Sequence, residues 1–225
     1  MVVMKKTFWL VLCLSVGAAA PGCSSGLKYT VDDAALDNVS AGEKKGVFDA
    51  KTEIEVANSE LRTAQSRLDA LERDLDVAKN EKKQADLEVE KAATEEESAV
   101  ASRDENRHAK AKQGKETAAF GVKVADAKLD WLDKKEDALK AEKTAAEAHQ
   151  KAAEAKTEFE KAKLAQQKNI KPDSNFSVGE YESQWKDKNS DWESAKKDAE
   201  SENKKANERE KDWKDLVAQH QKLRG

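Results

Sequence analysis

A seven-residue repeat of apolar residues, uninterrupted by glycine or proline over long stretches, constrains this chain more than any other feature. Two columns of the repeat run through its first half, and fourteen of their fifteen positions are apolar. The columns are Val47, Ile54, Leu61, Leu68, Leu75, Lys82 and Val89, and Ala50, Ala57, Ala64, Leu71, Ala78, Ala85, Ala92 and Ala99. Such a seam predicts a long helix that packs on another helix, and its alanines let the partner approach closely.

Two further helical segments follow. A second heptad seam runs from Phe120 to Ala162, and a third segment runs from Val178 to Leu223. Pro172 cannot continue a helix, so the chain is expected to reverse there. The sequence therefore predicts an all-α protein, an elongated antiparallel coiled coil or bundle of two to three long helices. The expected helices span about residues 43–110, 116–168 and 177–224.

The start of the first helix carries a capping signal. Ser40 and Glu43 have the spacing of a capping box, in which the serine caps the helix and the glutamate bonds back to the serine amide. The junction between the first two segments is ambiguous. Similar seam lengths favour a hairpin, whereas the second seam keeps the heptad phase of the first, as one continuous helix pairing with other copies would.

Tryptophans lie at heptad positions of the second and third segments. If the third helix folds back at Pro172, Trp185 is expected opposite Ala162 and Trp192 opposite Ala155. Large rings would then fill the space over an alanine face. We interpret Trp131, Trp185, Trp192 and Trp213 as helix-packing residues. The alternative is an exposed surface on which a ligand or glycan stacks.

The N-terminus has the pattern of a secretion leader. Lys5 and Lys6 precede an apolar run from Phe8 to Ala20, about 13 residues long, which is shorter than the roughly 20 residues that a membrane-spanning helix needs. Cleavage at Ala18-Ala19-Ala20 by an ordinary leader peptidase would leave Cys23 as a free thiol. Cys13 leaves with the leader, so Cys23 has no disulfide partner within the mature chain.

The end of this leader, Ala20-Pro21-Gly22-Cys23, resembles the lipobox of bacterial lipoproteins. The resemblance implies that the Cys23 sulfur receives a diacylglyceryl group, that cleavage falls before Cys23 and that the new amino end is acylated, commonly with palmitate. Two or three acyl chains anchor a protein stably, whereas one holds it only reversibly. Ser24, in the place where aspartate signals inner-membrane retention, favours the outer membrane, with the chain facing the periplasm or exposed at the surface.

The resulting organisation is a signal peptide at residues 1–22, a lipid anchor and tether at residues 23–42, and a helical coiled-coil region at residues 43–225. The tether contains Ser, Gly, Asp and Asn with scattered apolar residues, which is compatible with one short helix. We expect protein partners, or further copies of the chain, to bind through the helical faces.

Composition and motifs argue against other functions. Charged residues make up 38% of the chain, and 41 Lys and Arg are interleaved with 45 Asp and Glu, so the basic stripe that nucleic-acid binding requires is missing. The sequence contains no phosphate-binding glycine loop, serine elbow or Cys/His pair. His108 and His149 are expected to be solvated and His220 to be a helix-terminal cation, without a metal site. No cofactor, small-molecule substrate or enzymatic activity is expected.

The sequence thus favours a non-catalytic structural or scaffolding lipoprotein of the cell envelope. The alternative is a periplasmic chaperone-like clasp, or an accessory protein of secretion or efflux. A clasp would need apolar surface that remains open after the helical seams have paired.

Overall fold

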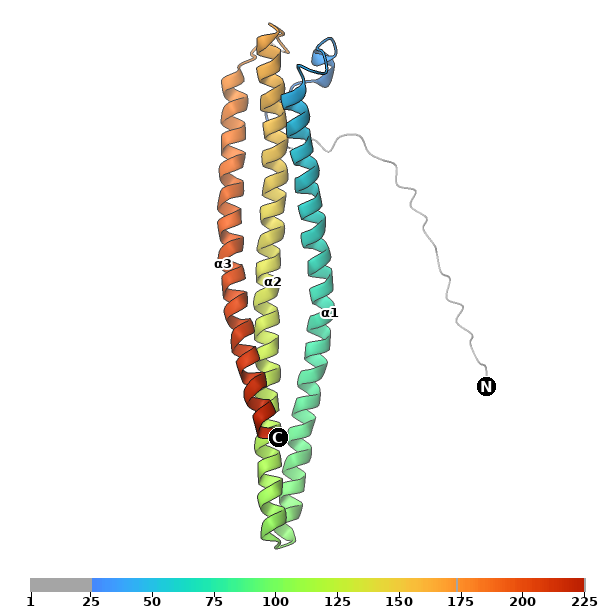
Figure 1. Cartoon of the computed structure of the whole chain (residues 1–225), viewed down its shortest axis with the longest axis vertical. Helices are drawn as coiled ribbons and strands as arrows, with labels where there is room; N and C mark the ends of the chain where they lie inside the picture. Colours follow the sequence, from blue (N-terminus) through green and yellow to red (C-terminus); the bar gives the residue numbers. More distant parts are fainter. Residues whose placement is uncertain (1–25, 173, 225) are drawn as a thin grey trace, which may run out of the picture.

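The computed structural model describes residues 26–172 and 174–224, and these residues form a long helical rod (Figure 1). A 3-10 helix, η1 (Asp33–Leu36), precedes three long helices, α1 (Lys45–Ala101), α2 (Glu105–Gln167) and α3 (Val178–Arg224). The helices run up and down in antiparallel succession. The predicted all-α, elongated antiparallel bundle is therefore confirmed.

The heptad seam explains how α1 packs. All eight buried residues of α1 belong to the two columns identified in the sequence, from Val47 to Ala99. Leu71, Leu75 and Ala78 form a core cluster with Leu132 and Leu139 of α2. Burial of large aliphatic side chains stabilises by about 1.5–3 kcal/mol each, so these leucines contribute more per residue than the alanines beside them.

The connection between α1 and α2 is a tight turn at residues 102–104, so the single continuous helix is wrong. Arg103 adopts the left-handed conformation with φ 53°. Asp104 then caps α2, its side chain accepting hydrogen bonds from the amides of Asn106 and Arg107. The helices therefore break at residues 102–104 and not between residues 110 and 116, where the sequence analysis placed the break. α1 ends at Ala101 rather than near residue 110, and α2 begins at Glu105 rather than near residue 116.

The three helices differ in length, which gives the rod two unlike ends. α1, α2 and α3 contain 57, 63 and 47 residues. At 1.5 Å per residue α2 is about 95 Å long and α3 about 70 Å. We call the end that holds the α2–α3 loop the base and the end that holds the α1–α2 turn the tip. Because α3 stops short of the tip, only α1 and α2 continue there (Figure 1).

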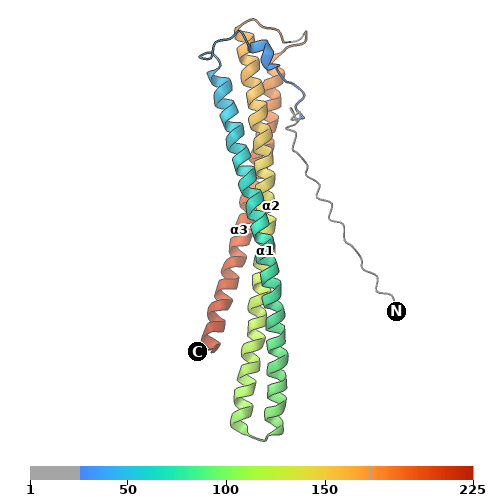
Figure 2. The same ribbon diagram turned by 90° about the vertical axis from the view of Figure 1, so that its right-hand side faces the viewer.

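The bundle is open on one side. α2 lies between its neighbours and packs on both along much of its length, whereas no described residue of α1 has its Cα within 8 Å of an α3 Cα. Figure 2 shows α3 diverging from α1 towards its C-terminal end. A closed three-helix bundle would bring all three helix pairs together. Here the wedge between α1 and α3 has α2 as its floor.

Residues 26–44 form a strap across the base, and this segment contains the short helix η1. The Gln184 side chain accepts hydrogen bonds from the amides of Lys28 (2.7 Å) and Tyr29 (3.0 Å) and donates one to the Tyr29 carbonyl (2.9 Å). The strap also buries Val31, Leu36 and Val39 in an apolar cluster. The cluster includes Val47, Ala162, Leu164, Ala165 and Tyr181.

A largely buried ion pair of α2, Glu158 and Lys161, binds the middle of the strap. Glu158 accepts a 2.6 Å hydrogen bond from the Val31 amide, and Lys161 bonds to the Val31 carbonyl and to Asp33. Lys161 and Glu158 also pair with each other at 2.8 Å. The ammonium of Lys161 lowers the pKa of Asp33. Burial acts to lower the pKa of Lys161, but its bonds to Asp33 and Glu158 outweigh burial and raise it.

The predicted capping box at the start of α1 is wrong in its geometry. The Ser40 hydroxyl bonds to the Glu43 carboxylate at 2.8 Å, and Lys44 occupies the N-cap of α1 without a side-chain cap. The two residues therefore close a turn of the strap just before the helix.

Candidate functional site

The predicted lipidation site and its leader lie outside the described residues. Cys23, the lipobox-like segment around it and the rest of residues 1–25 are not placed by the structure. Their roles therefore remain sequence-based predictions. What the structure adds is the position of the strap that follows them.

The predicted packing residues form a ladder of stacked rings between α2 and α3. Trp185 stacks on Phe159 with ring centroids 5.5 Å apart, and Trp213 stacks on Trp131 at 4.8 Å. Trp192 stacks on His149 at 4.1 Å with an interplanar angle of 6°. His220 stacks on Phe120 at the tip-side end of the ladder and approaches the Thr117 carbonyl at 3.1 Å.

The structure gives the tryptophans aromatic partners that the expected placement over alanines did not include. Trp185 stacks on Phe159, and Trp192 stacks on His149. The loop between Gln167 and Val178 reverses the chain, and aromatic side chains of α2 and α3 come into register. Ala162 is fully buried beside the strap.

His149 connects all three helices, contrary to the prediction that it is solvated. Only 6% of the residue is exposed. Its Nδ1 lies 2.7 Å from Glu60 Oε2 and its Nε2 lies 3.9 Å from Glu53 Oε1, both on α1. Glu53 in turn accepts a 2.5 Å bond from Lys156 of α2. Since Trp192 of α3 covers the imidazole ring, this cluster joins α1 and α3 through α2.

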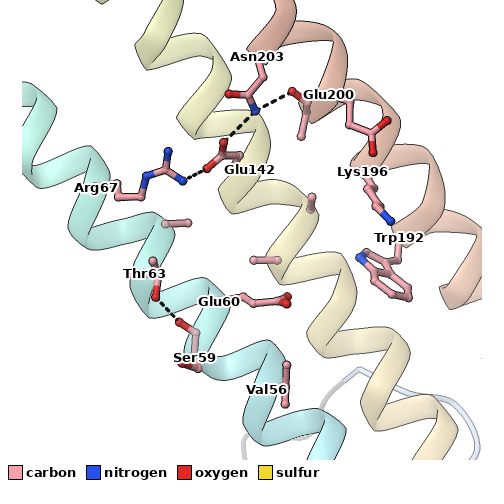
Figure 3. A pocket seen from close by; sticks show the side chains of 14 residues that line it. Val56, Ser59, Glu60, Thr63, Arg67, Glu142, Trp192, Lys196, Glu200 and Asn203 are labelled. Carbon is pink, nitrogen blue, oxygen red and sulfur yellow. Dashed lines mark hydrogen bonds and ion pairs between the residues drawn. The ribbon is translucent and has the colours of Figure 1, made fainter.

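Beside this cluster lies a groove of about 680 Å³ between α1 and α3 (Figure 3). Alanines from all three helices line its apolar floor, and Val56 and Trp192 line its sides. The alanines are Ala64, Ala145, Ala146 and Ala199. Val56 is 49% exposed, which makes it an unpaired apolar side chain at the groove wall.

A polar bridge closes the groove on its tip side. Arg67 of α1 forms a 2.6 Å ion pair with Glu142 of α2, and the Asn203 amide of α3 donates to the same carboxylate at 2.8 Å (Figure 3). Glu142 therefore serves as the shared acceptor for both outer helices. Lys196 and Glu200 line the rim on α3.

Two acids that line the groove are engaged by neighbouring side chains, Glu142 by Arg67 and Asn203, and Glu60 by His149. In residues 26–172 and 174–224 no three His, Cys, Asp or Glu side chains are grouped so that they could hold a metal ion. The apolar floor and the edge of Trp192 can accept an apolar face of a partner.

The residues that hold the strap were not identified from the sequence. Gln184, Glu158 and Lys161 look like ordinary polar positions of a charged helix, and nothing in their spacing distinguishes them. Their role depends on a segment more than a hundred residues away, which contacts them only in the folded chain.

Comparison of the chain with models of known protein families, with curated proteins and with solved structures found no match. Among the described helices, none combines the length and the apolarity that crossing a bilayer would require.

Proposed function

We propose that this chain is a lipid-anchored bacterial envelope protein that acts as a non-catalytic structural or scaffolding rod. The proposal takes the lipidation of Cys23, and a location on the outer membrane facing the periplasm, from the resemblance of the leader to those of lipoproteins. It takes the role of a rod from the fold.

The observation that carries the proposal is the docking of the strap at the base. Lys28 and Tyr29 are bonded to Gln184, which lies only six residues after the first residue of α3. The anchor end of the chain is therefore held at one end of a rod, and the tip extends tens of ångströms away from it. This arrangement suits a protein that presents a helical surface at a set distance from a membrane.

Fatty-acid labelling in the native cell tests the anchor. We expect Cys23→Ala to abolish palmitate incorporation and to release the chain from membranes. Cys13→Ala is the matched control, because Cys13 lies in the leader and should leave both properties unchanged. Continued labelling of the Cys23→Ala chain would contradict the proposal.

The open groove favours a second candidate, a chaperone-like clasp. A clasp needs exposed apolar surface in the folded state, and the groove offers Val56 and an alanine floor. If the groove is that surface, Val56→Asp should reduce the binding of an environment-sensitive dye. Val100→Asp, at a similarly exposed valine near the tip, should leave it unchanged. Equal effects of the two variants would argue against a clasp at this groove.

A further inference from the structure

The strap limits how far the rod can stand from its anchor, an argument that rests on the proposed lipidation of Cys23. Lys28 is bonded to Gln184, which is six residues into α3 and thus about 9 Å from the base end of that helix. The bonds from Glu158 and Lys161 to Val31 hold the next part of the strap at the same level. Residues 28–33 therefore stay bound to the rod and add nothing to the length of chain between the anchor and the rod.

The remaining chain is short. Five peptide links separate Cys23 from Lys28, and a fully extended chain spans at most about 3.6 Å per residue, which gives a reach of about 18 Å. An anchor on Cys23 can thus extend only about 9 Å past the base end of α3. The tip is beyond its reach because α1 alone is about 85 Å long. Any bilayer that holds the anchor must come into contact with the rod, at the base or along a side.

The base carries a surface suited to that contact. A hollow of about 420 Å³ opens in the α2–α3 connection, with Ile170, Phe176 and Val178 among its lining residues and Lys171 beside them. The three apolar side chains are half-buried and Lys171 is exposed. Apolar groups that remain partly exposed next to an ammonium suit the boundary between lipid headgroups and acyl chains, where the ammonium meets phosphate.

We propose that this hollow is a docking surface for the bilayer that holds the anchor, so that the rod stands on its base with the tip directed away from the membrane. The lipid anchor supplies the affinity. The hollow, held at the bilayer by the short chain from Cys23 to Lys28, sets the orientation. The partner at this surface is phospholipid, with Ile170 and Phe176 facing the glycerol region and Lys171 facing the phosphates.

Single labelled cysteines on the lipidated full-length mature chain test this orientation. Cys23 carries its lipid as a thioether and Cys13 has left with the leader, so an introduced cysteine is the one reactive thiol. The label is placed at Ser177→Cys beside the hollow, at Ala101→Cys near the tip, or at the middle of each helix with Ser66→Cys, Thr144→Cys and Ser201→Cys. All five positions are exposed. The protein is reconstituted into vesicles of phosphatidylethanolamine and phosphatidylglycerol that contain headgroup-quenching lipids.

We expect the label at residue 177 to lose most of its emission while the other four labels keep theirs. Comparable quenching of a mid-helix label would show a rod lying on the membrane and would overturn the proposal. Absence of quenching at every position would overturn it too. Phe176→Ser combined with Lys171→Glu should restore emission at residue 177, whereas Lys110→Glu near the tip should not. Unchanged quenching in the double variant would exclude the hollow as the docking surface.

Mass spectrometry of the same preparation distinguishes a failure of the proposed lipidation from a failure of the docking surface. If Cys23 carries no lipid, the proposed function fails together with this inference. If Cys23 is lipidated but the label at residue 177 is not quenched, only the docking surface is refuted.

Discussion

Replacing His149 with alanine should weaken the contacts of α2 with both outer helices. The imidazole bonds to Glu60 of α1 and stacks on Trp192 of α3. The substitution removes both contacts at once. It leaves no charge stranded in the core, because the Glu60 side chain is 52% exposed and water can solvate it.

The size of the effect follows from the two contacts. A hydrogen bond to a charged group contributes about 1.5–3 kcal/mol when protected from water, and the exposure of Glu60 places this one at the lower end. Stacking of two rings adds about 0.5–1.5 kcal/mol. We therefore expect His149→Ala to lower the free energy of unfolding by about 2–3 kcal/mol. His149→Phe keeps a ring against Trp192, so it should lose only the hydrogen-bond part.

Urea unfolding at neutral pH, followed by circular dichroism, measures these differences. A double-mutant cycle with Glu60→Gln and a second one with Trp192→Ala separate the two contacts. Alanine and phenylalanine variants of equal stability would show that stacking contributes nothing. A loss below about 0.5 kcal/mol for His149→Ala, the range of ordinary surface substitutions, would refute the role of His149 in joining the helices.

Three other predictions follow from particular contacts. Trp213→Phe should cost less stability than Trp185→Phe in thermal unfolding, because the Trp213 indole N–H is buried with no hydrogen-bond partner among the described residues; the reverse order would contradict this. Asp104→Ala should cost about 1 kcal/mol through loss of the α2 cap, seen as faster hydrogen exchange at the tip, while Asp104→Ser should keep the cap. The pKa of Asp33 is lowered in the folded chain, so its contribution to strap docking is present above its unfolded pKa and is lost as the pH falls through its folded pKa. Hydrogen exchange of the Val31 amide should accelerate over that acid range, and Asp33→Asn should remove this dependence.

The all-helical rod could be predicted because its signal is local and repeated. Each heptad of α1 adds further apolar residues to the same helix face, so the single polar residue in the columns, Lys82, does not obscure the pattern. The reversal near Pro172 could also be predicted, because proline disrupts a helix through its own backbone geometry. Both features can be predicted without knowing which residues pack against them.

The turn between α1 and α2 was misplaced because its signal is small. Three residues, Ser102, Arg103 and Asp104, make the reversal through one left-handed residue and one cap. The expected start of the second helix near residue 116 was too late because the charged residues after Asp104 are compatible with an exposed helix. A heptad phase shared by both seams did not require a continuous helix.

The candidate sites depend on contacts between distant residues, which a single repeat does not encode. α2 packs on two helices, and His149 contacts both of them, Glu60 on α1 and Trp192 on α3, which one heptad column does not indicate. The stacking register depends on how the α2–α3 loop places α3 along α2. The strap is held by Gln184, which no local pattern marks.

The intact mass of the mature chain recovered from the native cell envelope tests the central claim most directly. The account predicts a polypeptide that begins at Cys23 and carries the added mass of a diacylglyceryl group and an amide-linked acyl chain on that residue. A chain that begins before Cys23, or one that begins at Cys23 without lipid, would contradict the account of a lipid-anchored rod.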